Sequence, residues 1–203
     1  MASKKNFALH KLHTLLGLFP IGLFLLFHLT ANFQATKGPE AFNEAVGLIE
    51  KAPFLLFLEF AFIYLPLLFH AIYGLYLAFQ AKPNNGNYSF FRNQMYLWQR
   101  ITGVFTLIFI AWHVWQTRIV KALGTAEINY DLMHDIFTNP VMIAFYAVGV
   151  LSAVFHLCNG VWSFLVHWGI TVGPRSQRMA TYFTMILFVA LSYVGLRAVF
   201  AFV

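Results

Sequence analysis

Charged side chains are scarce in this sequence: Asp, Glu, Lys and Arg together make up 10% of 203 residues, while 60% are hydrophobic. A soluble globular domain carries about 25% charged residues and about 45–50% apolar ones. Such a composition does not provide the polar surface that a water-soluble fold needs. It excludes a soluble domain and predicts an integral membrane protein.

Cysteine is almost absent, since Cys158 is the single cysteine of the chain. One cysteine excludes a disulfide framework, a CxxC motif and a four-cysteine iron–sulfur site. The sequence also lacks a CxxCH motif, which excludes covalently attached c-type haem. It contains no Gly-rich phosphate loop and no repeat of fixed period.

Long apolar runs, by contrast, are abundant. Crossing a bilayer takes about 20 apolar residues in a helix, and five runs meet this length: residues 12–33, 54–79, 99–120, 141–166 and 179–202. No connection is large enough to fold as a catalytic domain, although KALGTAEINYDLMHDIFTNP has room for an interfacial helix. We therefore expect an all-α bundle of five transmembrane helices in a single domain, residues 1–203.

The first run follows three lysines and could be read as a secretory signal. A signal peptide has an apolar core of about 7–15 residues, and this run is longer and contains a histidine, His28. We expect it to be retained as a membrane span, with cleavage as the alternative.

The basic residues are unevenly distributed between the two sides of the membrane. Lys and Arg accumulate in cytoplasmic loops. With the N terminus inside, the inner segments carry Lys4, Lys5, Lys11, Lys82, Arg92, Arg100, Arg175 and Arg178, and the outer ones carry Lys37, Lys51, Arg118, Lys121 and Arg197. All seven carboxylates fall on the outer side or in the outer half of the second span. The sequence predicts a cytoplasmic N terminus and an external C terminus, with a basic inner face suited to anionic lipid or a docked subunit.

Four histidines lie within the predicted spans: His28, His70, His113 and His156. Ionisable residues inside a bilayer are costly, and their default interpretation is functional. At about 1.5 Å of rise per residue, His28 and His113 lie roughly 21–24 Å above the cytoplasmic ends of their spans. His70 and His156 lie roughly 14–15 Å above those ends. The histidines therefore sort into an outer and an inner pair, each contributed by alternate helices.

Two imidazoles that face each other across a bundle core can ligate one haem iron from both sides. Zinc fits less well, because it needs three or four ligands in one place. Two axial histidines fill both open positions of the iron and favour electron transfer over substrate binding. Gly74 and Gly160 follow the inner histidines by four residues and are candidates for haem packing, since residues i and i+4 share a helix face. The outer pair has no such glycine.

Cationic side chains near the span ends are candidates to bind the propionates of such haems. These are Arg118 or Lys37 for the outer haem and Arg100, Arg175 or His13 for the inner haem. Side chains of this kind are more often simple interfacial anchors. His10, His134 and His167 lie at span ends or in loops, where an imidazole is readily solvated.

The sequence also resembles a known family around all four histidines. The strings HKLHTLLGLFPIGLFLLFHL, FHAIYGLYLAF, QRITGVFTLIFIAWHVW and VFHLCNGVWSFLVHWGITVGPRSQR are similar to the dihaem cytochrome b membrane anchor of succinate:quinone oxidoreductase (succinate dehydrogenase), in the single-chain five-helix form of Bacillus-like bacteria. The resemblance runs from residue 9 to residue 203.

The resemblance implies a location and partners as well as cofactors. The anchor of this family lies in the bacterial cytoplasmic membrane and holds a flavoprotein and an iron–sulfur subunit on the cytoplasmic face. It binds two haem b groups and passes electrons from succinate to a quinone, usually menaquinone. The family's ligand positions match His28 with His113 for the outer haem and His70 with His156 for the inner haem. No succinate-oxidising site is expected on this chain.

The quinone site is not defined by the resemblance. Fumarate reductases of the family use a carboxylate near the outer end of a helix, and nothing here matches it by spacing. Glu59 is the nearest intramembrane carboxylate by position alone. It is a candidate for the quinone site, or else a residue bonded to a neighbouring helix.

Three other functions stay open at this point, of which the simplest is a purely structural membrane anchor without cofactors. One is the cytochrome b subunit of another respiratory dehydrogenase, such as a formate dehydrogenase or a hydrogenase. Another is a transporter or proton channel in which the histidines relay protons, although few Asp, Glu or Ser residues are available between the two layers to continue a relay.

Overall fold

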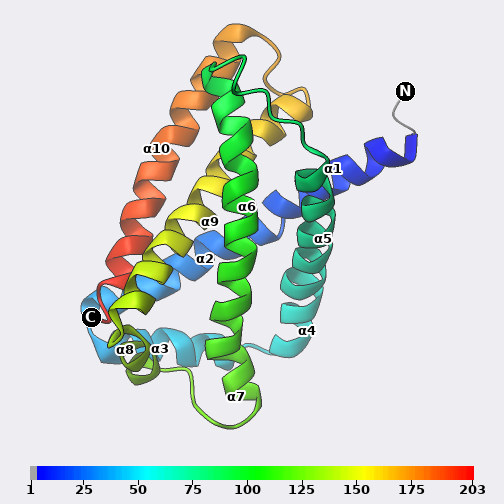
Figure 1. Ribbon diagram of the computed structural model, residues 1–203. Helices are drawn as coiled ribbons and strands as arrows, with labels where there is room; N and C mark the ends of the chain where they lie inside the picture. The colour runs from blue at the N-terminus through cyan, green and yellow to red at the C-terminus, as the bar shows by residue number, and fades with distance from the viewer. Residues whose placement is uncertain (1–3) are drawn as a thin grey trace.

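The computed structural model describes residues 4–203, and it is helical throughout. Within this part of the chain, five helical segments are long and apolar enough to cross a membrane: Asn6–Lys37, Leu55–Gln80, Phe91–Ala122, Pro140–His167 and Pro174–Val199. The predicted all-α fold with five spans is thus confirmed. Figure 1 shows the segments running between two ends of an elongated bundle.

The first span is two helices, α1 (Lys4–Leu18) and α2 (Ile21–Phe33). The break falls at Pro20, because proline has no backbone N–H to donate and its ring clashes with the preceding turn. A short 3₁₀ turn, η1 (Gln34–Lys37), then leads through Gly38, with φ of 110°, into α3 (Pro39–Glu50). Helix α3 lies at the end of the bundle opposite the N terminus and was not anticipated from the sequence.

The second span contains a π-helical turn. Helix α4 (Leu55–Glu59) continues through the π turn η2 (Phe60–Tyr64) into α5 (Leu65–Gln80). Pro66 stands at the start of α5, where it cannot donate a hydrogen bond to the preceding turn. The wider turn before it accommodates this loss, as π bulges often do.

The third span has the same kind of turn near its far end. It consists of α6 (Phe91–Val114), the π turn η3 (Trp115–Ile119) and α7 (Val120–Ala122). The following loop holds α8 (Tyr130–Phe137), which begins where the Asn129 side chain accepts a hydrogen bond from the Leu132 N–H (2.9 Å). This loop therefore contains a helix, as the sequence analysis allowed.

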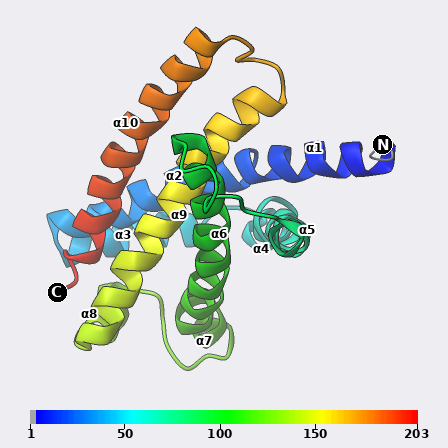
Figure 2. The ribbon, with the colours of Figure 1, turned by 45° about the horizontal axis from the view of Figure 1, so that its top comes forward.

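The last two spans are α9 (Pro140–His167) and α10 (Pro174–Val199). Helix α9 packs against α6 and α10, and α5 packs against α1. Figures 1 and 2 show α1 and α2 running obliquely across the more upright helices, with α1 extending beyond them.

The tightly packed core lies towards the end that carries α3 and α8. There Phe42, Met133, Phe137, Tyr146 and Phe202 are all buried in one cluster. Phe202 lies beyond α10, its ring centroid is 4.9 Å from that of Phe42, and its carbonyl accepts a hydrogen bond from Nδ1 of His134 (2.7 Å). The C-terminal residues therefore close this end of the bundle.

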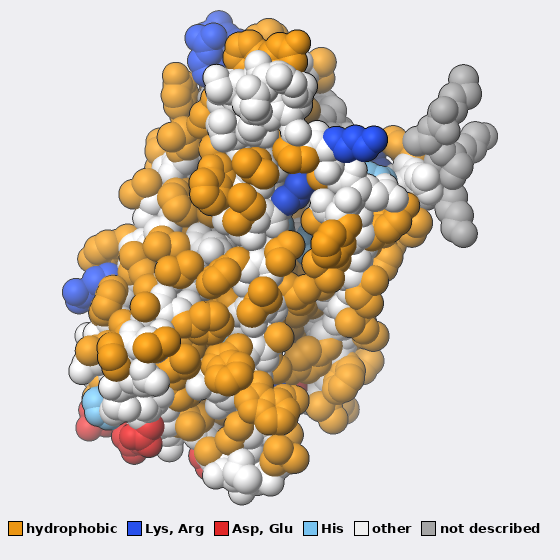
Figure 3. Space-filling model, in the orientation of Figure 1, with side chains coloured by type: hydrophobic (Ala, Val, Ile, Leu, Met, Phe, Trp, Pro, Cys, Tyr) orange, Lys and Arg blue, Asp and Glu red, His pale blue; other side chains and the backbone are white. Residues whose placement is uncertain are grey.

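The outer surface of the helices is apolar, as a lipid-facing surface must be. Figure 3 shows hydrophobic side chains over most of the visible face, with most of the visible Lys and Arg in the upper part and Asp and Glu at the lower end. Large side chains such as Phe57, Ile72 and Phe79 are exposed, the last by 83%. Exposure on this scale is unfavourable in water and favourable against acyl chains.

Candidate cofactor site

The inner histidines, His70 on α5 and His156 on α9, face each other within the bundle. Their ring centroids are 6.1 Å apart and their planes are nearly perpendicular, at 87°. With metal–nitrogen bonds of about 2.0–2.1 Å, two imidazoles on opposite sides of one metal ion have centroids roughly 6.3 Å apart. The structure therefore brings these two rings to a distance at which they fit a shared metal.

The outer histidines, His28 on α2 and His113 on α6, form a second pair. Their ring centroids are 5.7 Å apart, with an interplanar angle of 74°. This is slightly shorter than two metal bonds require, so small ring movements would accompany ligation. Helices α2, α5, α6 and α9 each contribute one histidine, and the structure pairs them as their depths in the spans predict.

Hydrogen bonds orient both inner rings. Nδ1 of His70 lies 3.0 Å from the backbone carbonyl of His13, and Nδ1 of His156 lies 3.0 Å from that of Gln99 and 3.2 Å from the Gln99 amide nitrogen. A carbonyl oxygen only accepts, so each of these backbone bonds places the proton on Nδ1. A proton held on Nδ1 leaves the Nε2 lone pair free for a metal, and such a hydrogen bond also raises ligand basicity. These bonds are the usual support of a metal-ligating imidazole.

The outer rings have longer contacts. Nδ1 of His113 lies 3.4 Å from the hydroxyl of Tyr146, and Nε2 of His28 lies 3.3 Å from the amide nitrogen of Asn32. The Asn32 amide also donates to the carbonyl of His28 (2.8 Å), one helical turn earlier. The outer pair is therefore held less firmly than the inner pair.

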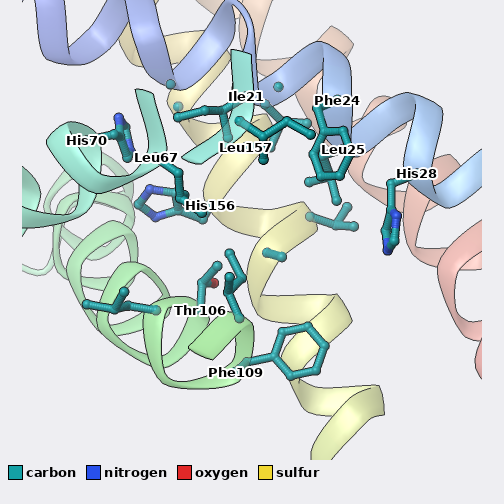
Figure 4. A pocket seen from close by; sticks show the side chains of 18 of the residues that line it. Ile21, Phe24, Leu25, His28, Leu67, His70, Thr106, Phe109, His156 and Leu157 are labelled. Carbon is teal, nitrogen blue, oxygen red and sulfur yellow. The ribbon is translucent and has the colours of Figure 1, made fainter. Parts of the chain in front are cut away.

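All four histidines line one cavity of about 1600 Å³. Figure 4 shows His70 and His156 on one side of it and His28 on the other. A pocket for one drug-sized ligand is about 300–1,000 Å³, so this cavity has room for more than one large planar cofactor. The described residues contain no group of three or more His, Cys, Asp or Glu that could hold a metal ion, and paired imidazoles beside a large apolar space suit haem better than a closed zinc site.

The glycines predicted to make room for a porphyrin have side chains beside them. A Cβ added to Gly74 would lie 3.1 Å from Nε2 of His13, and one added to Gly160 would lie 3.6 Å from Nε2 of Gln99. Both glycines line the cavity, so their role in haem packing stays a prediction.

Two other glycines touch the inner histidines directly and were missed. A Cβ added to Gly17 would lie 2.5 Å from Cε1 of His70, and one added to Gly103 would lie 2.8 Å from Cε1 of His156. The sequence does contain a signal for Gly17, because it follows His13 by four residues, as Gly74 follows His70.

Glu59 is engaged in an ion pair. Nη2 of Arg118 lies 2.8 Å from one carboxylate oxygen of Glu59, and Nε of Arg118 lies 3.1 and 3.2 Å from its two oxygens. The pair joins the end of α4 to η3, and both residues line the cavity. Of the two expectations for Glu59, bonding to a neighbouring helix is the one that the contacts show.

The remaining propionate candidates differ in position. Arg100 and His13 line the cavity that the described residues enclose, whereas Lys37 and Arg175 do not. The guanidinium carbon of Arg100 lies 3.3 Å from the centroid of the Tyr96 ring, and its Nε is buried without a hydrogen bond. Arg118 is bound to Glu59.

Five membrane spans that present paired imidazoles to a shared cavity define a polytopic helical membrane protein of the cytochrome b class. The family model described as "Succinate dehydrogenase/Fumarate reductase transmembrane subunit" matches residues 80–196. The chain is also 55% identical, over all 203 residues and the whole length of both chains, to the succinate dehydrogenase cytochrome b558 subunit of Bacillus subtilis (strain 168). The chain therefore belongs to the family of succinate dehydrogenase/fumarate reductase transmembrane subunits.

Proposed function

We propose that this chain, the membrane subunit of a succinate dehydrogenase complex, binds two haem b groups and connects an iron–sulfur subunit to a membrane quinone. His70 and His156 are the axial ligands of the inner haem, and His28 and His113 are those of the outer haem. The observation that carries this proposal is the pair of inter-ring distances, 6.1 and 5.7 Å, on one cavity. The cytochrome b558 name of the Bacillus relative supports haem b as the cofactor.

When bound, haem b supplies one-electron transfer, which needs neither a substrate position on the iron nor a proton. The protein's part is to fix the imidazoles and exclude water. The carbonyls of His13 and Gln99 hold the inner rings with Nε2 free. The apolar helix faces around the cavity keep the site dry.

The cavity lining argues against a proton relay. Figure 4 shows Ile21, Phe24, Leu25 and Leu157 between the inner histidines and His28. A relay needs hydrogen-bonding groups in continuous reach of one another, and apart from the histidines only Thr106 carries one among the labelled side chains. The same lining suits the apolar edges of a porphyrin.

The charges at the two ends support the proposed partners and orientation. The end opposite α3 and α8 exposes Lys82, Arg175 and Arg178, and basic residues favour the cytoplasmic side. We place the flavoprotein and iron–sulfur subunits of the complex on this basic face, with the N terminus cytoplasmic and the C terminus outside.

The quinone, menaquinone in the proposed complex, binds near the outer haem. Glu59 is the candidate polar group for it, because its side chain is 15% exposed and the residue lines the cavity. The ion pair with Arg118 holds that carboxylate in one position.

A reduced-minus-oxidised spectrum with haem quantitation on the purified complex tests this function. Two haem b groups per chain are expected. His70→Ala and His156→Ala should each remove the same spectral component, and His28→Ala and His113→Ala should each remove the other. A complex that keeps both components in all four variants would exclude these histidines as ligands, and activity with formate or hydrogen instead of succinate would assign the chain to another respiratory enzyme.

A further inference from the structure

Helices α1 and α5 pack together, and each carries a histidine that is followed four residues later by a glycine. His13 is followed by Gly17 on α1, and His70 is followed by Gly74 on α5. The His70 ring lies over Gly17 and the His13 ring lies over Gly74, as shown by the distances of 2.5 and 3.1 Å from an added Cβ. The two rings stack on each other, with centroids 4.1 Å apart and planes 5° from parallel.

Helices α6 and α9 repeat this arrangement. Gln99 is followed by Gly103 on α6, and His156 is followed by Gly160 on α9. The His156 ring lies over Gly103 at 2.8 Å from an added Cβ, and the Gln99 amide lies over Gly160 at 3.6 Å. The Gln99 amide nitrogen also donates to the carbonyl of His156 (3.0 Å). Gln99 therefore occupies the place in this helix pair that His13 occupies in the other.

The glycines explain how a side chain reaches a carbonyl that is already in use. Within a helix, the carbonyl of residue i accepts the N–H of residue i+4, but it has a second lone pair. A side chain at i+4 would cover that lone pair, and glycine leaves it open. Across Gly17 and Gly103, His70 and His156 donate to the carbonyls of His13 and Gln99, both at 3.0 Å.

We propose that Gly17 and Gly103 are positioning residues for the inner haem. They let each ligand ring approach the neighbouring helix closely enough for its Nδ1–H to bond the backbone carbonyl four residues earlier. Each bond fixes the tautomer that presents Nε2 to the iron. This inference rests on the proposed function, since it takes His70 and His156 as the ligands.

The arrangement distinguishes the inner site from the outer one. The residues four positions after His28 and His113 are Asn32 and Thr117, and their side chains bond back to the carbonyls of those histidines, at 2.8 and 2.7 Å. No backbone acceptor is recorded for either outer ring among the described residues. Substitutions at Gly17 and Gly103 should therefore affect one haem and leave the other unchanged.

The test compares Gly17→Ala and Gly103→Ala with Gly195→Ala in the purified complex. Gly195 is a matched control, because its added Cβ would lie 2.5 Å from Cγ1 of Val150 but does not meet a histidine. Loss of a ligand-supporting contact typically lowers metal affinity about 10–100-fold. We expect the first two variants to lose the inner haem on dilution about 10–100-fold more readily than the control, with a shifted low-spin EPR signal for that haem alone.

Equal haem retention and an unchanged inner signal in all three variants would overturn the proposal. If His70→Ala and His156→Ala still removed one haem, the proposed function would stand and only the positioning role would fail. If they removed none, the proposed function itself would fail.

A measurement on the unsubstituted complex tests the proposal even if the glycine variants do not fold. In the reduced, diamagnetic state, ¹⁵N spectra of histidine-labelled protein report which ring nitrogen carries the proton. We expect a protonated, hydrogen-bonded Nδ1 on both His70 and His156, assigned by comparison with the His→Ala variants. Iron ligation through Nδ1 of either residue would contradict the proposal.

Discussion

The imidazole of His13 stacks face to face on that of His70, with centroids 4.1 Å apart and planes 5° from parallel. His13 is thus in direct contact with a proposed inner ligand, although the sequence indicated it only as a candidate to bind a propionate. Its Nε2 is buried without a hydrogen bond partner in the structure. The stack and the backbone bond together hold His70 from one side.

Removing this stack should alter the inner site without abolishing it. His13→Ala keeps the backbone carbonyl that binds His70 but loses a ring pair worth about 0.5–1.5 kcal/mol. We expect weaker retention of the inner haem, by roughly tenfold at most, and a shifted EPR signal, measured on the purified complex. His10→Ala is the control, since the His10 ring contacts Tyr73 and not a ligand. The same change in both variants would refute a specific role for His13.

The outer pair has its own sensitive glycine. A Cβ added to Gly149 would lie 2.3 Å from the ring of Phe109, which stacks on His113 with centroids 5.9 Å apart. Overpacking of this kind typically costs about 1–3 kcal/mol. Gly149→Ala should therefore push Phe109 towards His113 and shift the spectrum of the outer haem. A spectral change in the inner haem alone would contradict this prediction.

The ion pair between Arg118 and Glu59 should stabilise the end of the bundle near the outer haem. Breaking one partner of a fully buried pair costs about 3–5 kcal/mol, and here the side chains are 29% and 15% exposed, so solvent screening reduces the expected loss to about 1–2 kcal/mol. Arg118→Ala should lower the melting temperature more than Arg118→Ala combined with Glu59→Gln, because the double variant leaves no unpaired carboxylate. A larger loss in the double variant would argue against this reasoning. The rate of quinone reduction by a complex with Glu59→Gln alone tests the separate proposal that Glu59 lies at the quinone site.

Arg92 links three helices at the basic end. Its guanidinium carbon lies 3.6 Å from the centroid of the Trp162 ring on α9, and Nη2 donates to the Thr181 hydroxyl on α10. A cation–π contact is worth about 0.5–2 kcal/mol. Arg92→Ala should lower the free energy of unfolding by about 1–2 kcal/mol, measured by thermal melting in detergent. Arg175→Ala, at an exposed position on the same face, should change it by less than about 0.5 kcal/mol; equal losses would show that Arg92 contributes nothing through these contacts.

Counting residues along the spans predicted which histidines share a depth, and the structure places each pair in contact distance. The same counting did not predict what lies beside each ring. Gly74 and Gly160 were expected to face a cofactor, yet His13 and Gln99 lie beside them. Intrahelical spacing says which side a residue occupies on its own helix, but not which side chain of another helix reaches that side.

Local chemistry was only partly readable. The proline break before α2 falls in a segment that hydropathy alone treats as one continuous span, and helix α3 falls in a segment that it treats as a loop. The partner of Glu59 could not be deduced, because Arg118 is 59 residues away in the sequence. Their approach depends on how the second and third spans lie next to each other.

The amino-acid sequence by itself determined the membrane class, the five spans and the depth of each histidine. Apolar length sets what crosses a bilayer, and the constant rise of a helix converts residue number into depth. The tertiary structure decided which helices are neighbours, and with that the closeness of Gly17 to His70 and of Gly103 to His156. Lateral packing depends on the fit between surfaces of segments far apart in the chain, and neither length nor periodicity within a single helix contains that information.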